Sequence, residues 1–145
     1  MRLNIEPLII EGGMVTDVRG RLAFVNDFDM KLVRRFYFIY HSTTDIIRAW
    51  QGHRIEKKWF YCVDGVFEVK LVKVDDWVSP SENLPCLTFI LDAQKSNVLY
   101  IPNGFANGFR ALRKDSRLLV FSDKKLEESL NDDYRFNEKL WNQWG

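Results

Sequence analysis

The sequence predicts an all-β protein, a sandwich or barrel of about eight or nine short strands with a short C-terminal helix. Asp64-Gly65 joins two apolar runs, which is the strongest local signal for a β-hairpin. From Val66 to Val74 the side chains alternate in character, as they do in a strand with one buried face. Turn residues recur every ~8–12 positions, a spacing that argues against a βαβ fold.

Length and composition fit one globular domain spanning residues 1–145. Hydrophobic residues make up 46% and aromatic residues 14% of the chain, more than disordered proteins contain. The net charge of +1 arises from 21 basic and 20 acidic residues that are well mixed. We therefore expect no nucleic-acid partner and no attraction to an anionic membrane.

Cysteine usage and the N-terminus indicate the compartment. Cys62 and Cys86 lack CxxC spacing, and the apolar part of the N-terminal segment is too short for a signal peptide. No apolar run approaches the ~18–20 residues that a membrane span needs. We expect a reduced, cytoplasmic protein with two free thiols and no membrane segment.

The first third of the chain contains three predicted segments. Leu8–Glu11 is a short strand that ends in a turn at residues 12–13, where two glycines follow each other. Residues 16–25 form a polar turn that enters a second strand. Val33–Tyr40 is rich in β-branched and aromatic residues and predicts a strand. A polar loop follows, in which we expect His41 to be solvated.

The stretch Ile46–Asp75 carries the predicted hairpin and, before it, a strand with polar side chains. By alternation, Ala49, Gln51 and His53 share one face of that strand. An aromatic run at residues 59–61 then leads into the hairpin turn. Polar side chains beside so much hydrophobic surface suggest a site.

The later segments continue the all-β pattern. The proline-rich stretch Asp75–Pro85 is a loop, and Leu87–Leu91 and Asn97–Ile101 are strands. Pro102–Phe109 contains two glycines and predicts a tight turn. Ser116–Ser122 is a last central strand.

The C-terminal tail from Glu127 to Gly145 differs in character from the preceding strands. It is first acidic and then aromatic, and Leu140, Trp141 and Trp144 stand at helical spacing. We expect a short helix that lies over the barrel or over a partner subunit.

Several segments together resemble one family. The pattern is similar to the cupin jelly roll (double-stranded β-helix), and within it to the dTDP-4-keto-6-deoxysugar 3,5-epimerases and the related 3,4-ketoisomerases. The resemblance covers nearly the whole chain. The matching segments are the DxRG element at Asp17–Gly20, the KRVYYIY-like strand at Arg34–Tyr40, the strand motif at Arg48–His53, the YIPPGFAHGF-like turn at Leu99–Phe109 and the terminal strand at Phe121–Asp123.

The chain departs from this family at its catalytic positions. The strand motif is RGxHxQ in the epimerases and RGxHxH in the ketoisomerases, whereas here Gln51 replaces the first histidine and His53 keeps the second position. Asn107 replaces the histidine of the turn. Where the epimerases carry TDYY, with a tyrosine that serves as general acid, this chain has Ser122-Asp123-Lys124-Lys125.

The resemblance implies removal of a proton next to a ketone. A base whose pKa lies near the working pH performs this step best, and histidine has an unperturbed pKa of about 6.5. We predict His53 as the base and Tyr37 as the proton donor, with Tyr61 and Tyr100 as further candidate donors. The alternative for His53 is a hydrogen-bonded structural histidine. Gln51 cannot titrate and is expected to orient the substrate.

The remaining site residues are predicted to bind substrate. Arg19 and Arg48 suit the diphosphate of a nucleotide sugar, most simply a dTDP-linked one. Tyr61, Tyr100 and Asn107 complete the predicted set. No cofactor is implied, and we expect no metal, because cupin metals need two or three histidines and a carboxylate. The resemblance also implies a homodimer formed by exchange of N-terminal strands.

Three functions remain open at this point. The first is an isomerase or epimerase acting on a nucleotide-linked 4-keto-6-deoxysugar in surface polysaccharide synthesis. The second is a sugar-nucleotide-binding cupin that has lost catalysis, as the replaced histidines suggest. The third is a structural interaction domain, suggested by the Trp-rich tail, which requires a barrel filled by side chains.

Overall fold

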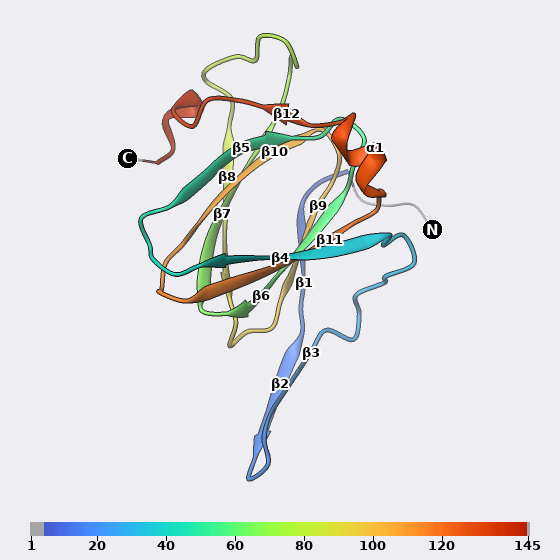
Figure 1. The fold of residues 1–145 in the computed structure, drawn as a ribbon, viewed down its shortest axis with the longest axis vertical. Coiled ribbons are helices and arrows are strands. Elements are labelled where there is room, and N and C mark those ends of the chain that lie inside the picture. Colours follow the sequence, from blue (N-terminus) through green and yellow to red (C-terminus); the bar gives the residue numbers. More distant parts are fainter. Residues whose placement is uncertain (1–4, 145) are drawn as a thin grey trace.

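The structure, a computed structural model, describes residues 5–144 (Figure 1). These residues form twelve strands, one short α-helix and one 3-10 turn, which confirms the all-β prediction. The helix α1 spans Leu126–Leu130 and the 3-10 turn η1 spans Leu140–Asn142. The strands are β1 (Leu8–Ile10), β2 (Gly13–Asp17), β3 (Gly20–Phe24), β4 (Arg35–His41), β5 (Ile47–Gly52), β6 (Lys58–Asp64), β7 (Val66–Lys73), β8 (Cys86–Asp92), β9 (Val98–Ile101), β10 (Phe105–Ala111), β11 (Ser116–Ser122) and β12 (Tyr134–Arg135).

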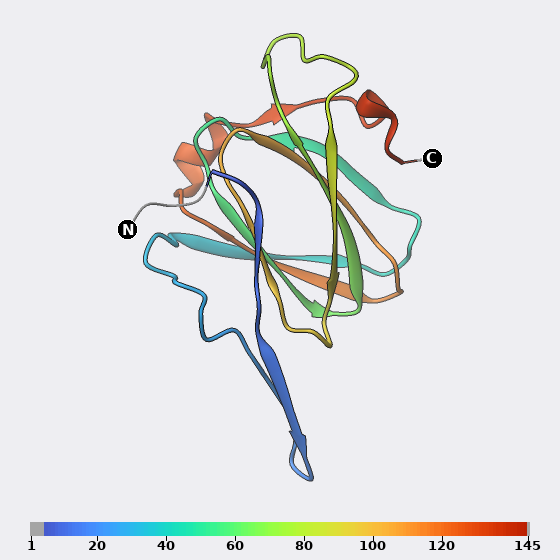
Figure 2. The same cartoon turned by 180° about the vertical axis from the view of Figure 1, so that it is seen from behind.

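Two five-stranded antiparallel sheets face each other and form the barrel (Figures 1 and 2). The first has the order β1-β9-β6-β11-β4 and the second the order β12-β5-β10-β7-β8. Burying one large aliphatic or aromatic side chain stabilises a fold by about 1.5–3 kcal/mol, so the space between the sheets is the main source of stability. The largest side chains there, each at most 1% exposed, are Phe60, Phe67, Val69, Leu71, Leu91, Leu99, Leu118 and Val120.

The predicted hairpin is formed by β6 and β7. Gly65 between them has φ +77°, a left-handed conformation that glycine adopts without steric cost. A Cβ atom at this position would lie 2.0 Å from Ser116 Oγ, so the close packing of β11 also requires glycine. The predicted alternation along β7 is confirmed, and its buried face consists of Phe67, Val69 and Leu71.

A hairpin arm of β2 and β3 projects away from the barrel (Figures 1 and 2). The predicted glycine turn at residues 12–13 is wrong, because Gly13 already begins β2. The turn of the arm lies between Asp17 and Gly20, within the predicted polar turn of residues 16–25. Exposed apolar side chains on a projecting arm are typical of a contact surface. On this arm they are Val15, Val18 and Leu22.

The C-terminal residues cover the outer face of the second sheet. The predicted short helix is present as α1, although it precedes the Trp-rich segment. The helical spacing of Leu140, Trp141 and Trp144 yields only a 3-10 turn, which Trp141 interrupts with φ +68°. Trp141 and Trp144 pack against Trp50 of β5 with ring centroids 5.0 and 5.6 Å apart. Aromatic packing, rather than a helix, therefore holds this segment on the sheet.

The predicted tight turn at Pro102–Phe109 is wrong in extent. The turn is shorter, and Phe105–Ala111 forms β10, which lies between β5 and β7 in the second sheet. Gly108 sits inside this strand because a Cβ atom there would come within 2.8 Å of the Ala49 side chain. The glycine permits close packing of β10 against β5.

His41 is buried, contrary to the prediction of a solvated loop residue. It ends β4 and is 4% exposed. Its ring packs against Phe67 and Phe109 at centroid distances of 5.6 and 5.9 Å. Burial, and to a smaller degree the charge of Arg48, lowers the pKa of His41. The ring is therefore part of the core in its neutral form.

Both cysteines are free, as predicted. Burial raises the pKa of the Cys62 thiol to about 12, so this thiol is unreactive. Among the described residues, no helix has the length and apolar character needed to cross a membrane.

Candidate active site

A cavity of about 300 Å³ lies between the two sheets. Its wall combines strands of both sheets with residues 126–135, which we call the C-terminal strap. The cavity contradicts the interaction-domain hypothesis, which requires a filled barrel. The polar wall is formed by Arg35, Tyr37, Arg48, Gln51, Lys58, Asn107, Ser129, Asp133 and Arg135. The apolar wall is formed by Ile39, Phe60, Phe109, Leu126 and Leu130.

A β-bulge brings Arg48 and Gln51 into the same wall. In a regular strand, residues three apart face opposite sides. Here Asn107 pairs with Gln51 but Phe109 pairs with Arg48, so β5 contains one extra residue relative to β10. Arg48 and Gln51 both line the cavity, whereas Ala49 packs in the outer aromatic cluster. The prediction that Ala49 shares a face with Gln51 is wrong for this reason.

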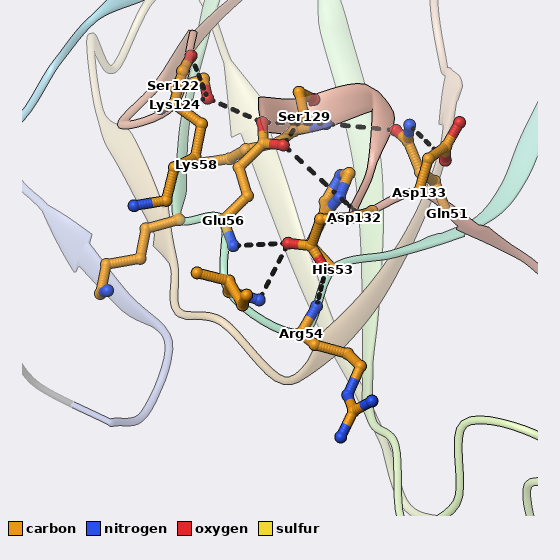
Figure 3. Close-up of polar contacts among 12 residues, drawn as sticks. Gln51, His53, Arg54, Glu56, Lys58, Ser122, Lys124, Ser129, Asp132 and Asp133 are labelled. Atoms are coloured by element: carbon orange, nitrogen blue, oxygen red, sulfur yellow. Dashed lines mark hydrogen bonds and ion pairs between the residues drawn. The ribbon is translucent and has the colours of Figure 1, made fainter. Parts of the chain in front are cut away.

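A chain of hydrogen bonds crosses the cavity wall from Lys58 through Gln51 to Asp133 (Figure 3). It continues from Asp133 to Arg135. Lys58 Nζ donates to Gln51 Oε1 over 3.2 Å, and Gln51 Nε2 donates to Asp133 Oδ1 over 3.1 Å. Arg135 Nε donates to the same oxygen over 2.8 Å. Burial acts to raise the pKa of Asp133, but the bonds from Arg135 and Gln51 outweigh it and lower that pKa. Asp133 is therefore an anion that fixes the Gln51 amide.

Tyr37 and Asn107 are the predicted site residues that face the remaining space. The Tyr37 ring lies 5.1 Å from the Arg35 guanidinium and 5.8 Å from Lys58 Nζ, measured to the ring centroid. Asn107 Nδ2 is buried and has no hydrogen-bond partner within residues 5–144. Buried donors are normally paired, so this amide marks a place for a ligand atom or water.

His53 lies behind the cavity wall and is 3% exposed (Figure 3). Its Nδ1 is 2.6 Å from the carbonyl oxygen of Asp132. A carbonyl only accepts, so Nδ1 carries the proton and Nε2 the lone pair. Nε2 is buried and has no partner in the described part of the chain. Burial, followed by the charge of Lys58, lowers the pKa of His53.

Asp132 ties the strap to the turn that follows β5 (Figure 3). Its carboxylate accepts hydrogen bonds from the backbone N–H groups of Arg54, Ile55 and Glu56 at 2.8, 2.9 and 2.8 Å. Asp132 is 6% exposed, so these bonds are shielded from water. This contact fixes the strap as one wall of the cavity.

Three predicted substrate-binding residues do not line the cavity. Arg19 lies on the β2–β3 arm and pairs with Asp17 at 2.6 Å. The Tyr61 hydroxyl is 2.9 Å from Ser96 Oγ. Tyr100 is 3% exposed, and burial, with a smaller contribution from Asp123, raises its pKa to about 12. Tyr61 and Tyr100 belong to a separate hydrophobic cluster around Trp59 and Val98.

The cavity also contains charged residues that the sequence interpretation missed. Lys58 was detectable in principle, because it directly precedes the aromatic run at residues 59–61. Arg35 adjoins the predicted Tyr37. Asp133 and Arg135 carried no signal, since they come from the strap and reach the site only through the tertiary fold. Within residues 5–144, no group of three or more His, Cys, Asp and Glu could hold a metal ion.

Comparison with known families identifies one match. The family model described as FdtA, WxcM-like, C-terminal, matches residues 7–142. Comparison with curated proteins gives no match.

Solved structures with the same fold include 3,4-ketoisomerases and a 3,5-epimerase. A 3,4-ketoisomerase from Helicobacter canadensis has a TM-score of 0.70 and 20% identity, covering 95% of this chain and 96% of its own. The QdtA 3,4-ketoisomerase from Thermoanaerobacterium thermosaccharolyticum, a double mutant in complex with TDP, has a TM-score of 0.69 and 22% identity over 92% and 90%. The dTDP-4-dehydrorhamnose 3,5-epimerase from Bacillus anthracis has a TM-score of 0.76 and 17% identity over 96% and 83%. These similarities confirm the predicted cupin fold.

Proposed function

Because the chain belongs to the FdtA, WxcM-like C-terminal family, we propose that it is an isomerase-type enzyme acting on a nucleotide-linked 4-keto-6-deoxysugar. The observation that carries the proposal is the barrel cavity, in which Tyr37, Arg48 and Lys58 meet. A ketoisomerase of the same fold, 21% identical with a TM-score of 0.69, holds TDP-4-keto-6-deoxyglucose. A dTDP-linked sugar is therefore the first substrate to test.

The proposed reaction removes a proton from a carbon next to the ketone and returns it. The enolate that forms needs positive charge near its oxygen. The Lys58 ammonium has three donors and gives one to Gln51, which leaves donors for the enolate. The Tyr37 side chain faces the same space. As the phenolate it would take the proton from carbon, and as the resulting phenol it would give the proton back. We assign proton exchange to Tyr37, because the predicted base His53 does not line the cavity.

Arg48 is the group best suited to bind the diphosphate. It lines the cavity, and no ion pair among the described residues involves it. A free guanidinium binds phosphate oxygens in bidentate fashion. Gln51 and Asn107 then orient the sugar hydroxyls, Gln51 in the fixed position that Asp133 gives it.

We also propose that two copies pair through the β2–β3 arm. The arm projects from its own barrel and exposes apolar side chains, which supports a contact with a second copy (Figure 1). The predicted role of Arg19 in substrate binding then requires the partner's cavity. The proposed setting, taken from the family resemblance, is surface polysaccharide synthesis in the cytoplasm.

The test begins with thermal unfolding in the presence of dTDP, dTDP-glucose and dTDP-4-keto-6-deoxyglucose. Ligand at ~100 times its dissociation constant stabilises the fold by about 2.7 kcal/mol and raises the melting temperature by several degrees. Arg48→Ala should abolish this shift. Arg113→Ala, which removes an exposed arginine elsewhere, should preserve it.

Turnover is then followed by NMR in D₂O with the keto sugar. We expect deuterium to enter next to the carbonyl and a new sugar isomer to appear. Binding with neither exchange nor isomer would contradict the enzyme proposal and favour the inactive sugar-nucleotide-binding cupin. The absence of any thermal shift would contradict the nucleotide-sugar site itself.

A further inference from the structure

Glu56 is a buried carboxylate that does not line the cavity but contacts residues that do. Its side chain has no exposed surface. Ser122 Oγ donates to Oε2 over 2.7 Å, and Ser129 Oγ donates to Oε1 over 2.6 Å (Figure 3). Three basic groups surround it: Arg35 at 3.5 Å, Lys58 at 4.0 Å and His53 Nδ1 at 3.5 Å.

These contacts join four parts of the fold at one point. Ser122 belongs to β11, Arg35 to β4, Lys58 to β6 and Ser129 to the strap. Arg35 and Lys58 extend past Glu56 into the cavity wall. Arg35 is held further by its Nη2 donation to Ser129 Oγ over 2.9 Å. Glu56 is therefore the shared anchor of two cavity cations.

Stability alone does not account for a buried charge of this kind. Removing two charges from water costs as much as or more than their attraction returns, and apolar replacements of buried ion pairs are often equally stable. The arrangement instead fixes the positions of the neighbouring cationic side chains. A Lys side chain has four flexible bonds, and a fixed anion at its end restricts the ammonium to one position.

We propose that Glu56 is a positioning residue, which holds the Lys58 ammonium against Gln51 and toward the substrate carbonyl, and holds Arg35 beside Tyr37. This inference rests on the proposed function, because it specifies how the site presents positive charge to the enolate. Glu56 takes no part in proton transfer, since it is closed off from the cavity.

The test replaces Glu56 by Gln, which keeps the shape and removes the charge. We expect kcat to fall about 10²-fold, as for a catalytic group displaced by about 1 Å. KM should change by less than about threefold, and the dTDP thermal shift by less than about one degree. Glu68→Gln is the matched control, because it also breaks a Glu–Arg pair, with Arg110 at 2.9 Å, that lies outside the cavity lining. Equal activity of Glu56→Gln and wild type would overturn the proposal.

Two structural readouts separate positioning from general destabilisation. In a crystal structure of Glu56→Gln, Lys58 Nζ should leave Gln51 Oε1, a contact of 3.2 Å in the wild type. Glu56 acts to raise the pKa of His53, so the variant should lower that pKa further by NMR. His41, the other histidine of the two in the chain, is the internal reference. An unmoved Lys58 would refute positioning.

A second variant keeps the test decisive if Glu56→Gln fails to fold. Ser122→Ala removes one donor to Glu56 and leaves the charge in place. It should lower kcat several-fold at unchanged KM, and an unchanged kcat would count against the proposal. If the wild type turns over none of the keto sugars, the proposed function fails, while the position of Lys58 in the two crystal structures still decides the role of Glu56.

Discussion

Replacing Asp132 by Ala should destabilise the fold strongly, because one buried carboxylate satisfies three backbone N–H groups. These belong to residues 54–56 and lie 2.8, 2.9 and 2.8 Å from its oxygens. A hydrogen bond to a charged group contributes about 1.5–3 kcal/mol, and an unpaired buried donor costs about 1–3 kcal/mol. Since the three bonds share one acceptor and water can enter the space left behind, they are not additive. We expect a loss of about 3–5 kcal/mol.

The assay is urea unfolding monitored by tryptophan fluorescence, together with the melting temperature. At ~2–4 °C per kcal/mol for a chain of this size, the melting temperature should fall by about 10 °C. Asp132→Asn keeps one acceptor oxygen and should lie between Asp132→Ala and the wild type.

The matched control for this experiment is Asp76→Ala. Asp76 also accepts backbone hydrogen bonds, from Val78 and Ser79 at 2.9 and 3.0 Å, but it is exposed to water. Its loss should cost much less than the loss of Asp132, because water can take the place of the missing acceptor. If Asp132→Ala costs as little as Asp76→Ala, the argument from burial is refuted and Asp132 does not hold the strap.

Three further predictions concern the core, the site and the hairpin. Burial lowers the pKa of His41, so the unfolded state binds the proton more tightly, and stability should fall as the pH drops below the unfolded pKa of about 6.5. His41→Phe should weaken this pH dependence, measured by urea titrations at pH 7.5 and 5.5. An unchanged pH dependence would contradict the prediction. Tyr37→Phe should lower kcat by about 10²–10⁴-fold at unchanged melting temperature, and near-normal turnover of the keto sugar would exclude Tyr37 from proton exchange. Gly65→Ala places a Cβ atom 2.0 Å from Ser116 Oγ, whereas the Cβ atom of Gly104→Ala, also at positive φ, meets nothing within 4 Å. Gly65→Ala should therefore lower the free energy of unfolding by at least about 1 kcal/mol more than Gly104→Ala. Equal losses would show that only backbone strain acts.

Local patterns predicted much of the fold because local physics determines those parts. The Asp64-Gly65 turn and the alternation of Phe67, Val69 and Leu71 depend on backbone conformation and on one buried face, and both are visible in the sequence. His41 could not be placed in this way. It follows an aromatic strand and precedes polar residues, and only its packing against Phe67 and Phe109 buries it.

The candidate site was predicted in part for the same reason. Arg48, Gln51 and Asn107 line the cavity as expected, but the bulge that orients Arg48 is a property of pairing between β5 and β10 and has no local signature. Asp133 and Gln51 are 82 positions apart in the sequence, so no local pattern near either residue predicts their contact. Long-range pairings of this kind are decided by the whole fold.

The C-terminal strap follows every strand of the two five-stranded sheets except β12, and it supplies one wall of the cavity. During synthesis, the barrel strands therefore leave the ribosome before the residues that complete the site. A chain interrupted ahead of the strap would lack Ser129, Asp132 and Asp133, and with them one hydrogen-bond partner each of Glu56 and Gln51. The pocket is therefore complete only after translation has passed this point, and truncated products of the gene would lack a complete site.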